Sequence, residues 1–408
     1  MNYNEALDYI HSLGRFSHPA GLERIKLLLD KLNNPQNSFP AIHIAGTNGK
    51  GSVAVMIAEA FKTAGFKTGL YISPYIIRFN ERIQINGQHI SDEDLAEMCD
   101  TVKGKNVDCT EFEFITAAAF TYFAKEKCDI VIAETGLGGR FDATNALANK
   151  KISVITKIGI DHAAVLGDTI EKITAEKCGI IGSCTTVASP YQTQQALKVI
   201  RRSANKLVVP DVAQLKVLKS DITGNSFIYK GREYETRLIG EHQIENALCA
   251  IEALENSGYN LPYNIIYNGI KNAFIPARLE NVSSKRNVLV DGAHNPDAAD
   301  RLAHFIGEYK GSVGAIVGVM KDKDYDYILK RVLPLCKDAV AVECADMPRA
   351  LSAKELAEEA SKYCSCKVAT DFDEAVNIAA QFGTDLIIAF GSLYLAANIR
   401  EKLKEKFK

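Results

Sequence analysis

Ile42–Ser52 has the sequence IHIAGTNGKGS, and this stretch decides the fold. Its apolar start belongs to a predicted strand over Ala41–Ala45, and the periodicity that follows predicts a helix near Gly51–Thr63. The glycines between them let backbone N–H groups approach phosphate oxygens, the helix N-terminus adds partial positive charge, and Lys50 supplies a full charge. The stretch therefore predicts a loop that cradles a triphosphate.

The loop departs from the strict G-x-x-x-x-G-K-[ST] pattern. Gly51 separates Lys50 from Ser52, and Ile44 stands where the first glycine is required. The Ser52 hydroxyl can still reach Mg²⁺. A glycine-rich turn with an incidental lysine is the alternative interpretation. The residues expected to bind the nucleotide here are Gly46, Thr47, Asn48, Gly49, Lys50, Gly51 and Ser52.

The chain around this loop has 408 residues, and at roughly 100–200 residues per domain its length predicts two or three domains. Hydrophobic residues make up 47% and charged residues 24%, which argues against disordered, collagen-like and coiled-coil proteins. Lys and Arg number 48 against 50 Asp and Glu, so no global field draws the protein to nucleic acid or to an acidic membrane. We expect neither as a partner.

Cysteine usage and the N-terminus bear on location. The ten cysteines are scattered, and the closest pair, Cys364 and Cys366, has CxC spacing, which indicates neither a zinc ribbon nor a thioredoxin-type site. Met1–Leu13 lacks the apolar centre of a signal peptide, and no apolar run approaches the roughly 18 residues that span a bilayer. We expect a reducing, cytoplasmic location.

Apolar runs of strand length alternate with helical periodicity on both sides of the loop, which predicts an α/β fold with a mostly parallel sheet. Between about 206 and 239, short β-like pieces predict a small antiparallel patch, with turns at Gly224–Asn225 and Lys230–Gly231. The other elements expected here are strands Ile130–Ala133 and Ile152–Thr156, patch strands Lys206–Val209, Phe227–Tyr229 and Tyr234–Leu238, and helices near Phe114–Lys125, Thr169–Cys178 and Ile244–Ser257.

The polar stretch Ile275–Asn287 marks a domain boundary. We therefore expect a phosphate-binding domain of the P-loop type at 1–277 and a smaller Rossmann-like α/β domain at 278–408. The charged run Arg400–Lys408 is expected to be a solvated helix end without a functional role. The elements expected in the second domain are strands Asn287–Val290, Ala315–Val319, Ala339–Val342 and Leu386–Phe390, and helices near Ala353–Lys362 and Asp373–Gln381.

Two polar groups follow predicted strands of the first domain. Glu134 ends the buried run that begins at Asp129, where ligands of parallel sheets bind, so it could hold a metal ion or be satisfied by local backbone. The sequence GLGGRFDATN over Gly136–Asn145 suits a substrate loop. His162 follows the strand Ile152–Thr156, so a neutral imidazole could join Glu134 around a second cation, although a lone histidine is more often structural.

Lys177 has a structural interpretation when spacing alone is considered. Asp168 and Glu171 stand in the relation of a capping box, with Asp168 as the N-cap. Gly179 occupies the position of a C′ glycine, so Lys177 becomes a last-turn lysine that complements the helix dipole.

Several motifs occur together in the order known from one enzyme family. They are Gly46–Ser52, Ser73-Pro74 with Asn80–Ile83, Glu134 with Gly136–Asn145, Asp161-His162, Glu241–Ala247, Arg278–Glu280, Asp291–Pro296 and Gly391–Tyr394. On these motifs the chain resembles the folylpolyglutamate synthases of the Mur ligase superfamily over essentially its whole length. The GGRFDATN segment is more similar to the bifunctional bacterial members, which are also dihydrofolate synthases.

This resemblance implies an ATP-dependent amide ligase, with an ATPase domain like the central domain of Mur ligases at 1–277 and a glutamate-ligase domain at 278–408. In that family ATP phosphorylates the carboxylate of a folate, the amine of L-glutamate attacks the acyl phosphate, and ADP, phosphate and the amide are released. Bifunctional members also add the first glutamate to dihydropteroate. The implied partners are small molecules, and the family expectation is a monomer. A monofunctional folylpolyglutamate synthase and another Mur-type amino-acid ligase are the alternatives.

The resemblance also implies roles for single residues. The catalytic candidates are Lys50, Lys177 and His294. The groups implied around two Mg²⁺ ions are Ser52, Ser73, Glu134, His162 and Lys177, the lysine as an anionic carbamate. The nucleotide would also be contacted by Asn246, Arg278 and Asp291, and the substrates by Arg82, Arg140, Asp142, His294 and Ser392. Ala277 stands where the family commonly has glycine, so we expect this backbone to be less permissive of positive φ.

Two competing classes fit the sequence less well. A cell-wall Mur ligase needs an additional N-terminal domain, and only 45 residues precede Gly46. A GTPase switch requires an [NT]KxD guanine-reading motif, and the nearest match, Thr156–Gly159, lacks the aspartate.

Overall fold

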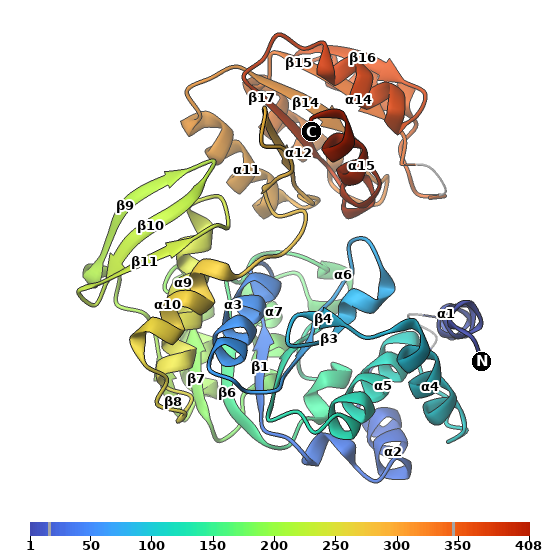
Figure 1. The fold of residues 1–408 in the computed structure, drawn as a ribbon, viewed down its shortest axis with the longest axis vertical. Helices are drawn as coiled ribbons and strands as arrows, with labels where there is room; N and C mark the ends of the chain where they lie inside the picture. The colour runs from blue at the N-terminus through green and yellow to red at the C-terminus, as the bar shows by residue number, and fades with distance from the viewer. Residues whose placement is uncertain (15–17, 345–346) are drawn as a thin grey trace. The chain divides into compact units, whose positions relative to one another are not determined.

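The computed structural model describes residues 1–14, 18–344 and 347–408, and it confirms the α/β fold. The chain divides into two compact units. The first unit comprises Met1–Lys216, Phe227–Thr236 and Ile244–Phe274, and the second comprises Val217–Ser226, Arg237–Gln243 and Ile275–Lys408. Each unit has its own sheet and is described separately below (Figure 1).

The large sheet of the first unit has the strand order β4-β3-β2-β5-β1-β6-β7-β8 in the described residues. Strands β2, β5, β1, β6, β7 and β8 are parallel, and β3 and β4 extend the edge in antiparallel fashion. The bounds are β1 (Ala41–Ala45), β2 (Thr68–Tyr71), β3 (Ile83–Ile85), β4 (Gln88–His89), β5 (Ile130–Glu134), β6 (Lys150–Ile155), β7 (Thr185–Ala188) and β8 (Lys206–Val208). The predicted mostly parallel sheet is therefore confirmed.

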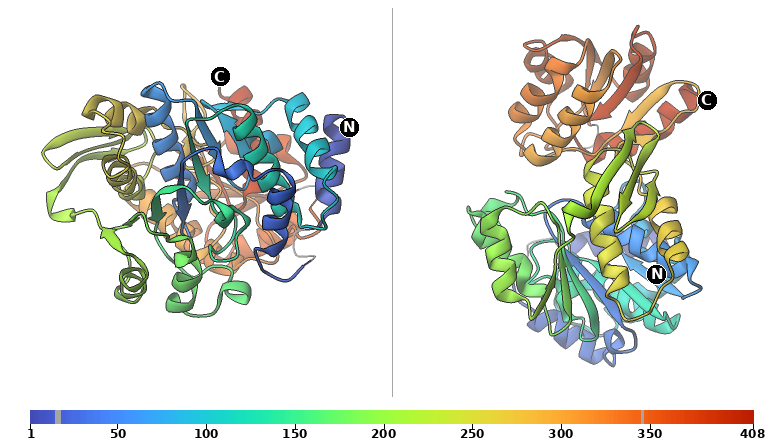
Figure 2. Two further views of the ribbon diagram at one scale, coloured as in Figure 1. Left: turned by 90° about the horizontal axis from the view of Figure 1, so that it is seen from below. Right: turned by 90° about the vertical axis from the view of Figure 1, so that its left-hand side faces the viewer.

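Helices cover both faces of this sheet (Figure 2, right view). On one face, Ala41, Val131 and Ala133 pack in a cluster with α5, while Ala45 and Ile155 pack with α7 and α8. Helix α3 contacts β1, β2 and β5, and α10 packs on α3. The helices before residue 275 are α1 (Tyr3–Ser12), α2 (Glu23–Lys31), α3 (Lys50–Thr63), α4 (Asp92–Lys103), α5 (Glu111–Lys125), α6 (Ala163–Leu166), α7 (Ile170–Lys177), α8 (Gln194–Ser203), α9 (His242–Glu255) and α10 (Tyr263–Asn272).

The antiparallel patch is present as a separate sheet with the order β11-β10-β9, formed by β9 (Leu215–Asp221), β10 (Gly224–Tyr229) and β11 (Arg232–Thr236). Two details of the prediction are wrong. Lys206–Val208 pairs in parallel with β7 at the edge of the large sheet, because a short apolar run does not reveal which neighbour it will pair with. Gly224 and Asn225 begin β10 and do not form the turn that precedes it.

The sheet of the second unit has the order β12-β13-β17-β14-β15-β16. All neighbours are parallel except β12, which pairs with β13 in antiparallel fashion. The strands are β12 (Glu280–Asn281), β13 (Asn287–Val290), β14 (Val313–Val317), β15 (Asp338–Val342), β16 (Ser365–Ala369) and β17 (Leu386–Phe390), and the helices are α11 (Pro296–Glu308), α12 (Tyr325–Val332), α13 (Ala353–Ala360), α14 (Phe372–Ala380) and α15 (Leu393–Lys406). This is the Rossmann-like arrangement that the sequence predicts.

The C-terminal charged run is not simply a solvated helix end. It belongs to α15, and Arg400 within it is buried at 7% exposure in an ion pair with Glu280. The prediction for this residue is wrong because its partner lies 120 positions earlier, where sequence periodicity gives no signal.

Candidate functional site

The phosphate loop forms the predicted junction between β1 and α3. Gly49 occupies the N-cap of α3 with φ of 88°, a conformation that favours glycine. A Cβ at this position would also collide with the amide oxygen of Asn246. Helix α3 begins at Lys50, so the N–H groups of its first turn, Lys50 and Ser52 included, have no carbonyl of a preceding turn to bond. Such a terminus attracts phosphate.

Lys50 lies between this loop and the neighbouring strand. Its Nζ donates to the carbonyl of Thr47 over 3.3 Å and lies 3.7 Å from Oε1 of Glu134, which is 4% exposed. The other carboxylate oxygen of Glu134 accepts the backbone N–H of Ser73 over 3.1 Å. Lys50, Glu134 and Ser73 thus meet at the carboxyl ends of the neighbouring parallel strands β1, β5 and β2.

The loop after β6 supports the phosphate loop from its other side. The carbonyl of Lys157 accepts the N–H of Thr47 over 2.9 Å, and the Thr47 hydroxyl exchanges hydrogen bonds with both backbone groups of Gly159. This loop continues to Asp161 and His162. The His162 side chain is 48% exposed, its Nε2 lies 3.8 Å from Asp161 Oδ1, and its φ is 52°. His162 is therefore accessible to a ligand.

Lys177 is buried at 5% exposure, and its Nζ donates to the carbonyl of Gly46 over 2.8 Å. Burial, and after it the charge of Lys50, lowers the pKa of this amine to about 7. A lysine that serves as a helix-terminal cation would point to solvent, so this geometry opposes the structural interpretation. Lys177 faces the phosphate loop across the carboxyl end of the sheet.

The capping pattern predicted around Lys177 is wrong. Thr169 is the N-cap of α7, and its side chain accepts the N–H of Lys172. Asp168 instead pairs with the exposed Lys172 ammonium. Gly179 is not a left-handed C′ residue, because the chain continues from α7 into a 3₁₀ turn at Cys178–Ile180. Asp168 and Thr169 are both suitable N-caps, and spacing alone cannot choose between adjacent candidates.

The predicted substrate loop is folded around the Asp142 carboxylate. One oxygen accepts the N–H groups of Gly136 and Leu137, each over 2.9 Å, and the other accepts both the N–H and the hydroxyl of Thr144. Burial raises the pKa of Asp142, and the hydrogen bonds from Thr144, Leu137 and Gly136 oppose the rise. The Asp142 carboxylate therefore holds the loop in its folded conformation.

The same loop is docked on the turn that carries Lys177, a relationship that the sequence did not reveal. A Cβ at Gly139 would lie 2.6 Å from the Lys177 carbonyl, and one at Gly179 would collide with the Cα of Arg140. The Arg140 N–H donates to the carbonyl of Glu176 over 2.8 Å. The sequence signal for this docking was the pair Gly139 and Gly179, one on each segment, because glycine permits close approach of two backbones.

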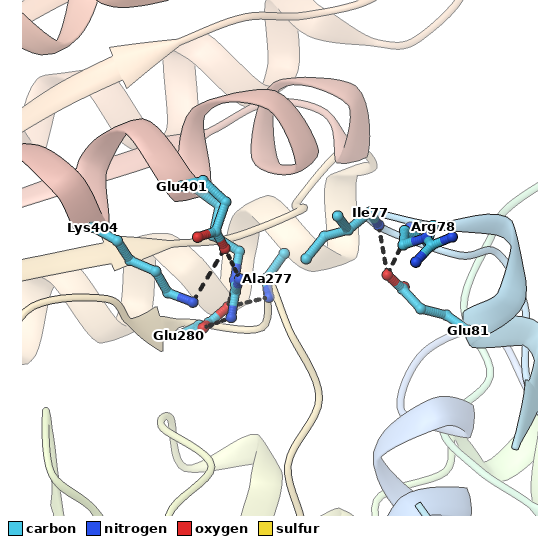
Figure 3. Close-up of polar contacts among 8 residues, drawn as sticks. Ile77, Arg78, Glu81, Ala277, Glu280, Glu401 and Lys404 are labelled. Atoms are coloured by element: carbon cyan, nitrogen blue, oxygen red, sulfur yellow. Dashed lines mark hydrogen bonds and ion pairs between the residues drawn. The ribbon is translucent and has the colours of Figure 1, made fainter. Parts of the chain in front are cut away.

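Arg82 lies beside the loop that follows β2. It is buried at 6% exposure, its carbonyl accepts the Ile72 N–H over 3.1 Å, and its guanidinium carbon lies 5.2 Å from the ring centroids of both Tyr75 and Phe79. The neighbouring Glu81 carboxylate fixes the loop by accepting the N–H groups of Ile76, Ile77 and Arg78, and Figure 3 shows the contacts with Ile77 and Arg78.

In the second unit, Asp291, His294 and Ser392 follow the adjacent parallel strands β13 and β17, so they lie at the same edge of that sheet. Nδ1 of His294 lies 2.7 Å from the Gly292 carbonyl, so Nδ1 carries the proton of the neutral ring and Nε2 is the basic nitrogen. Ser392 is the N-cap of α15 and lies 3.4 Å from the Cys344 sulfur.

Arg278 lies on the turn that leads into β12, between two residues with left-handed backbone. Ala277 has φ of 54° and Leu279 has φ of 48°. Ala277 thus adopts positive φ, contrary to our expectation from the missing glycine. The carboxylate of Asp291 accepts the Leu279 N–H over 2.8 Å with one oxygen and the Ala293 N–H over 2.8 Å with the other. Burial raises the pKa of Asp291, and the nearby Arg278 charge opposes the rise.

Comparisons with known proteins agree with this geometry. Residues 44–254 match the Mur ligase middle domain, and residues 277–393 match the glutamate ligase domain of Mur ligases. The dihydrofolate synthase/folylpolyglutamate synthase of Bacillus subtilis is 36% identical over 98% of this chain and 99% of its own. The chain belongs to the dihydrofolate synthase/folylpolyglutamate synthase family of Mur ligases.

Solved structures of this family have the same fold. The Escherichia coli protein in complex with DHPP and ADP superposes with a TM-score of 0.88 at 28% identity, covering 100% of this chain and 99% of that one. The bifunctional Yersinia pestis enzyme with AMPPNP and Mn ion gives 0.86 at 30% identity, covering 99% and 98%. As a member of the family, the chain is an ATP-dependent ligase of folate metabolism.

The residues around the phosphate loop can be compared with the ligands that Mg²⁺ takes in proteins. In the part of the chain that the structure describes, no group of three or more His, Cys, Asp and Glu side chains is arranged to hold a metal ion. Mg²⁺ is usually bound by one or two carboxylates together with substrate phosphates and water. The buried Glu134 carboxylate beside the phosphate loop fits that donor set.

Two general expectations can also be compared with the structure. All ten cysteines are free thiols. Among the helices of the described ranges, none combines the length and the apolar character that crossing a bilayer requires.

Proposed function

We propose that this chain ligates L-glutamate to the side-chain carboxylate of folates, and also to dihydropteroate, through an acyl phosphate formed from ATP. The observation that carries the proposal is the arrangement of Lys50, Glu134 and Lys177 around the phosphate loop. The Lys50 ammonium, the Glu134 carboxylate and the buried Lys177 amine meet there at the carboxyl ends of parallel strands, where phosphoryl transfer needs charge neutralisation.

The residues of the loop bind and orient the nucleotide in this proposal. Lys50 neutralises charge on the transferring phosphoryl group, and the first-turn N–H groups of α3 hold phosphate oxygens. The residues proposed to contact the nucleotide are Gly46, Thr47, Asn48, Gly49, Lys50, Gly51, Ser52, Asn246, Arg278 and Asp291.

Mg²⁺ would be held at two sites by Glu134, His162, the hydroxyls of Ser52 and Ser73, and the carbamate of Lys177, together with phosphate oxygens. When bound, it would neutralise phosphate charge and orient the transferring group. Because the protein supplies so few anionic ligands, we expect a divalent ion to bind tightly only with the nucleotide. Manganese titration with and without ADP measures this directly.

Carbamylation of Lys177 is supported by its burial and by its lowered pKa of about 7. The neutral amine attacks CO₂, a C–N bond forms, and one proton is released to give an anionic carbamate. An ordinary lysine with a pKa near 10.4 is almost wholly protonated at pH 7 and reacts poorly. The buried amine of Lys177 is far better suited to this reaction.

Glutamate would be bound by Arg82, His294 and Ser392, and the pterin acid by the loop that includes Arg140 and Asp142. The basic Nε2 of His294 is oriented by the Nδ1 contact with Gly292, so it could accept the proton that the glutamate amine loses during attack. We further propose a functional boundary between 1–277 and 278–408, a monomeric state and a cytoplasmic location.

ADP release in the presence and absence of dihydropteroate, tetrahydrofolate and glutamate tests the proposal. Turnover should require an acid substrate and glutamate together. Lys50→Ala should abolish it, whereas Lys62→Ala, an exposed position on the same helix, should leave it unchanged. ATP turnover that is indifferent to every pterin would contradict the proposal.

A further inference from the structure

The turn that carries Arg278 is held in an unusual conformation. Ala277 and Leu279, one on each side of Arg278, have φ of 54° and 48°. Neither residue belongs to the types that adopt left-handed backbone readily. Such conformations persist only where the surroundings fix them, and they concentrate at functional sites.

Three hydrogen bonds fix this turn at its backbone. The N–H of Ala277 donates to Oε2 of Glu280 over 3.1 Å, and the Ala277 carbonyl accepts the N–H of Gly292 over 2.9 Å. The N–H of Leu279 donates to Asp291 over 2.8 Å. The Glu280 carboxylate is therefore one of the groups that hold the conformation on the N-terminal side of Arg278.

Arg400 fixes the Glu280 carboxylate in turn. Its Nε donates to Oε2 over 2.7 Å and its Nη2 to Oε1 over 2.6 Å, a bidentate pair whose side chains are 9% and 6% exposed. The remaining Nη1 of Arg400 bonds Glu401, which also accepts from Lys404 over 3.3 Å. Figure 3 shows Ala277, Glu280, Glu401 and Lys404 gathered around this network.

The arrangement has features that stability alone does not require. Replacing a buried ion pair by apolar side chains is often neutral or stabilising, so such a pair is a poor stabilising device. Apolar side chains could not, however, accept the Ala277 N–H or set the orientation of an acceptor beside it. The Glu280 carboxylate accepts the Ala277 N–H, and its bidentate pair with Arg400 sets its orientation. The pair also links the turn to the long helix α15.

We propose that Arg400 is a positioning residue for nucleotide binding. By clamping Glu280, it holds the Ala277–Leu279 turn in the conformation that presents the Arg278 guanidinium to ATP. This inference rests on the proposed contact between Arg278 and the nucleotide. No role for Arg400 follows from the sequence motifs, because Arg400 lies outside all of them.

A double-mutant cycle in the full-length chain tests the proposal. Arg400→Met should raise the KM for ATP about ten-fold with a smaller change in kcat, and should lower Tm. In an Arg278→Ala background, Arg400→Met should lower Tm by the same amount but change the KM for ATP less than about two-fold. Lys402→Met is the matched control, because Lys402 lies on the same helix and pairs with the exposed Asp373.

A second variant separates positioning from stability. Glu280→Met combined with Arg400→Met removes both charges, so Tm should recover toward that of the parent protein. The KM for ATP should remain raised, because the Glu280 carboxylate that accepts the Ala277 N–H is absent from this variant. This variant also serves if Arg400→Met alone fails to fold.

The outcomes distinguish an error in the proposed contact between Arg278 and the nucleotide from an error in the positioning role of Arg400. If Arg278→Ala leaves the KM for ATP and the affinity for ADP unchanged, the proposed nucleotide contact is wrong. Arg278→Ala could instead raise the KM for ATP and weaken ADP binding. If the effects of the Arg400 and Arg278 substitutions on the KM for ATP then multiply independently, the positioning role is wrong. Recovery of both Tm and KM in the double-methionine variant would also overturn it.

Discussion

The Nζ of Lys177, at the end of α7, donates a 2.8 Å hydrogen bond to the carbonyl of Gly46, the first residue of the phosphate loop. The two residues are 131 positions apart in the sequence. This contact places a buried amine, and not a solvated helix-terminal lysine, beside the groups that bind phosphate.

Carbamylation of Lys177 should make activity depend on CO₂ and on pH. The reactive neutral amine grows more abundant as pH rises through about 7, the lowered pKa of Lys177. Enzyme depleted of CO₂ should therefore lose activity, and bicarbonate should restore it with a lower requirement at pH 8 than at pH 6. Lys177→Ala should be insensitive to bicarbonate and partly rescued by acetate. Full activity of Lys177→Ala without any added anion would return Lys177 to a structural role.

Gly179→Ala should damage the contact between the substrate loop and the Lys177 turn. Its Cβ would collide with the Arg140 backbone, so we expect a destabilisation of about 1–3 kcal/mol and a raised KM for the pterin acid. Gly182→Ala is the control, because nothing lies within 4 Å of a Cβ there, and it should change stability by less than about 0.5 kcal/mol. Urea unfolding and steady-state kinetics measure both effects. Equal behaviour of the two variants would refute the close-approach argument.

Ala277→Gly should stabilise the protein. Left-handed backbone costs a non-glycine residue about 1–2 kcal/mol, and glycine loses about 0.4–1 kcal/mol through the entropy of the unfolded chain, so the net gain should be about 0.5–1 kcal/mol. Ala273→Gly, where φ is −55°, should destabilise instead. Thermal unfolding of the two variants compares them, and a loss of stability in Ala277→Gly would contradict the strained turn.

His43 should make the stability of the first unit sensitive to acid. Its side chain is fully buried on β1, its Nε2 lies 2.8 Å from the Thr144 hydroxyl, and burial, then the Lys150 charge, lowers its pKa well below 6.5. Above about pH 6.5 the His43 ring is neutral in both the folded and the unfolded protein. Below about pH 6.5 the ring binds a proton in the unfolded protein but not in the folded one. Stability is therefore lost as pH falls, by up to about 1.4 kcal/mol per pH unit.

His43→Gln should reduce this acid sensitivity. The difference in unfolding free energy between pH 7 and pH 5 should shrink by up to about 2 kcal/mol, as urea denaturation would measure. His89→Gln, at an exposed position of β4, is the control and should keep the parent difference. An unchanged pH dependence in His43→Gln would show that the buried imidazole is not the group responsible.

The sequence predicted best where a signal was local. The strands Ala41–Ala45, Asn287–Val290 and Leu386–Phe390 were predicted to the residue, because each is a short apolar run with clear ends. Glu134 was predicted at the carboxyl end of a buried strand, where ligands of parallel sheets bind, and the structure places it there, 3.7 Å from the Nζ of Lys50.

Prediction from the sequence failed where contacts between distant parts of the chain determine the structure. Lys206–Val208 was assigned to the wrong sheet, since parallel and antiparallel edge strands share the same short apolar pattern. The burial of Arg400 depends on Glu280, and the positive φ of Ala277 depends on Glu280, Gly292 and Asp291 together. The docking of Gly139 on the Lys177 turn likewise arises from tertiary contact and not from periodicity.

The central claim is ATP-dependent ligation of glutamate to a pterin carboxylate, and a mass-resolved product assay tests it most directly. The chain is incubated with Mg-ATP and L-glutamate, with dihydropteroate in one tube and tetrahydrofolate in another, beside Lys50→Ala as the inactive control. We expect both acids to gain glutamate, with one ADP formed for each amide. Product from tetrahydrofolate alone would keep the ligase chemistry and withdraw the dihydropteroate activity, and product from neither would contradict the claim.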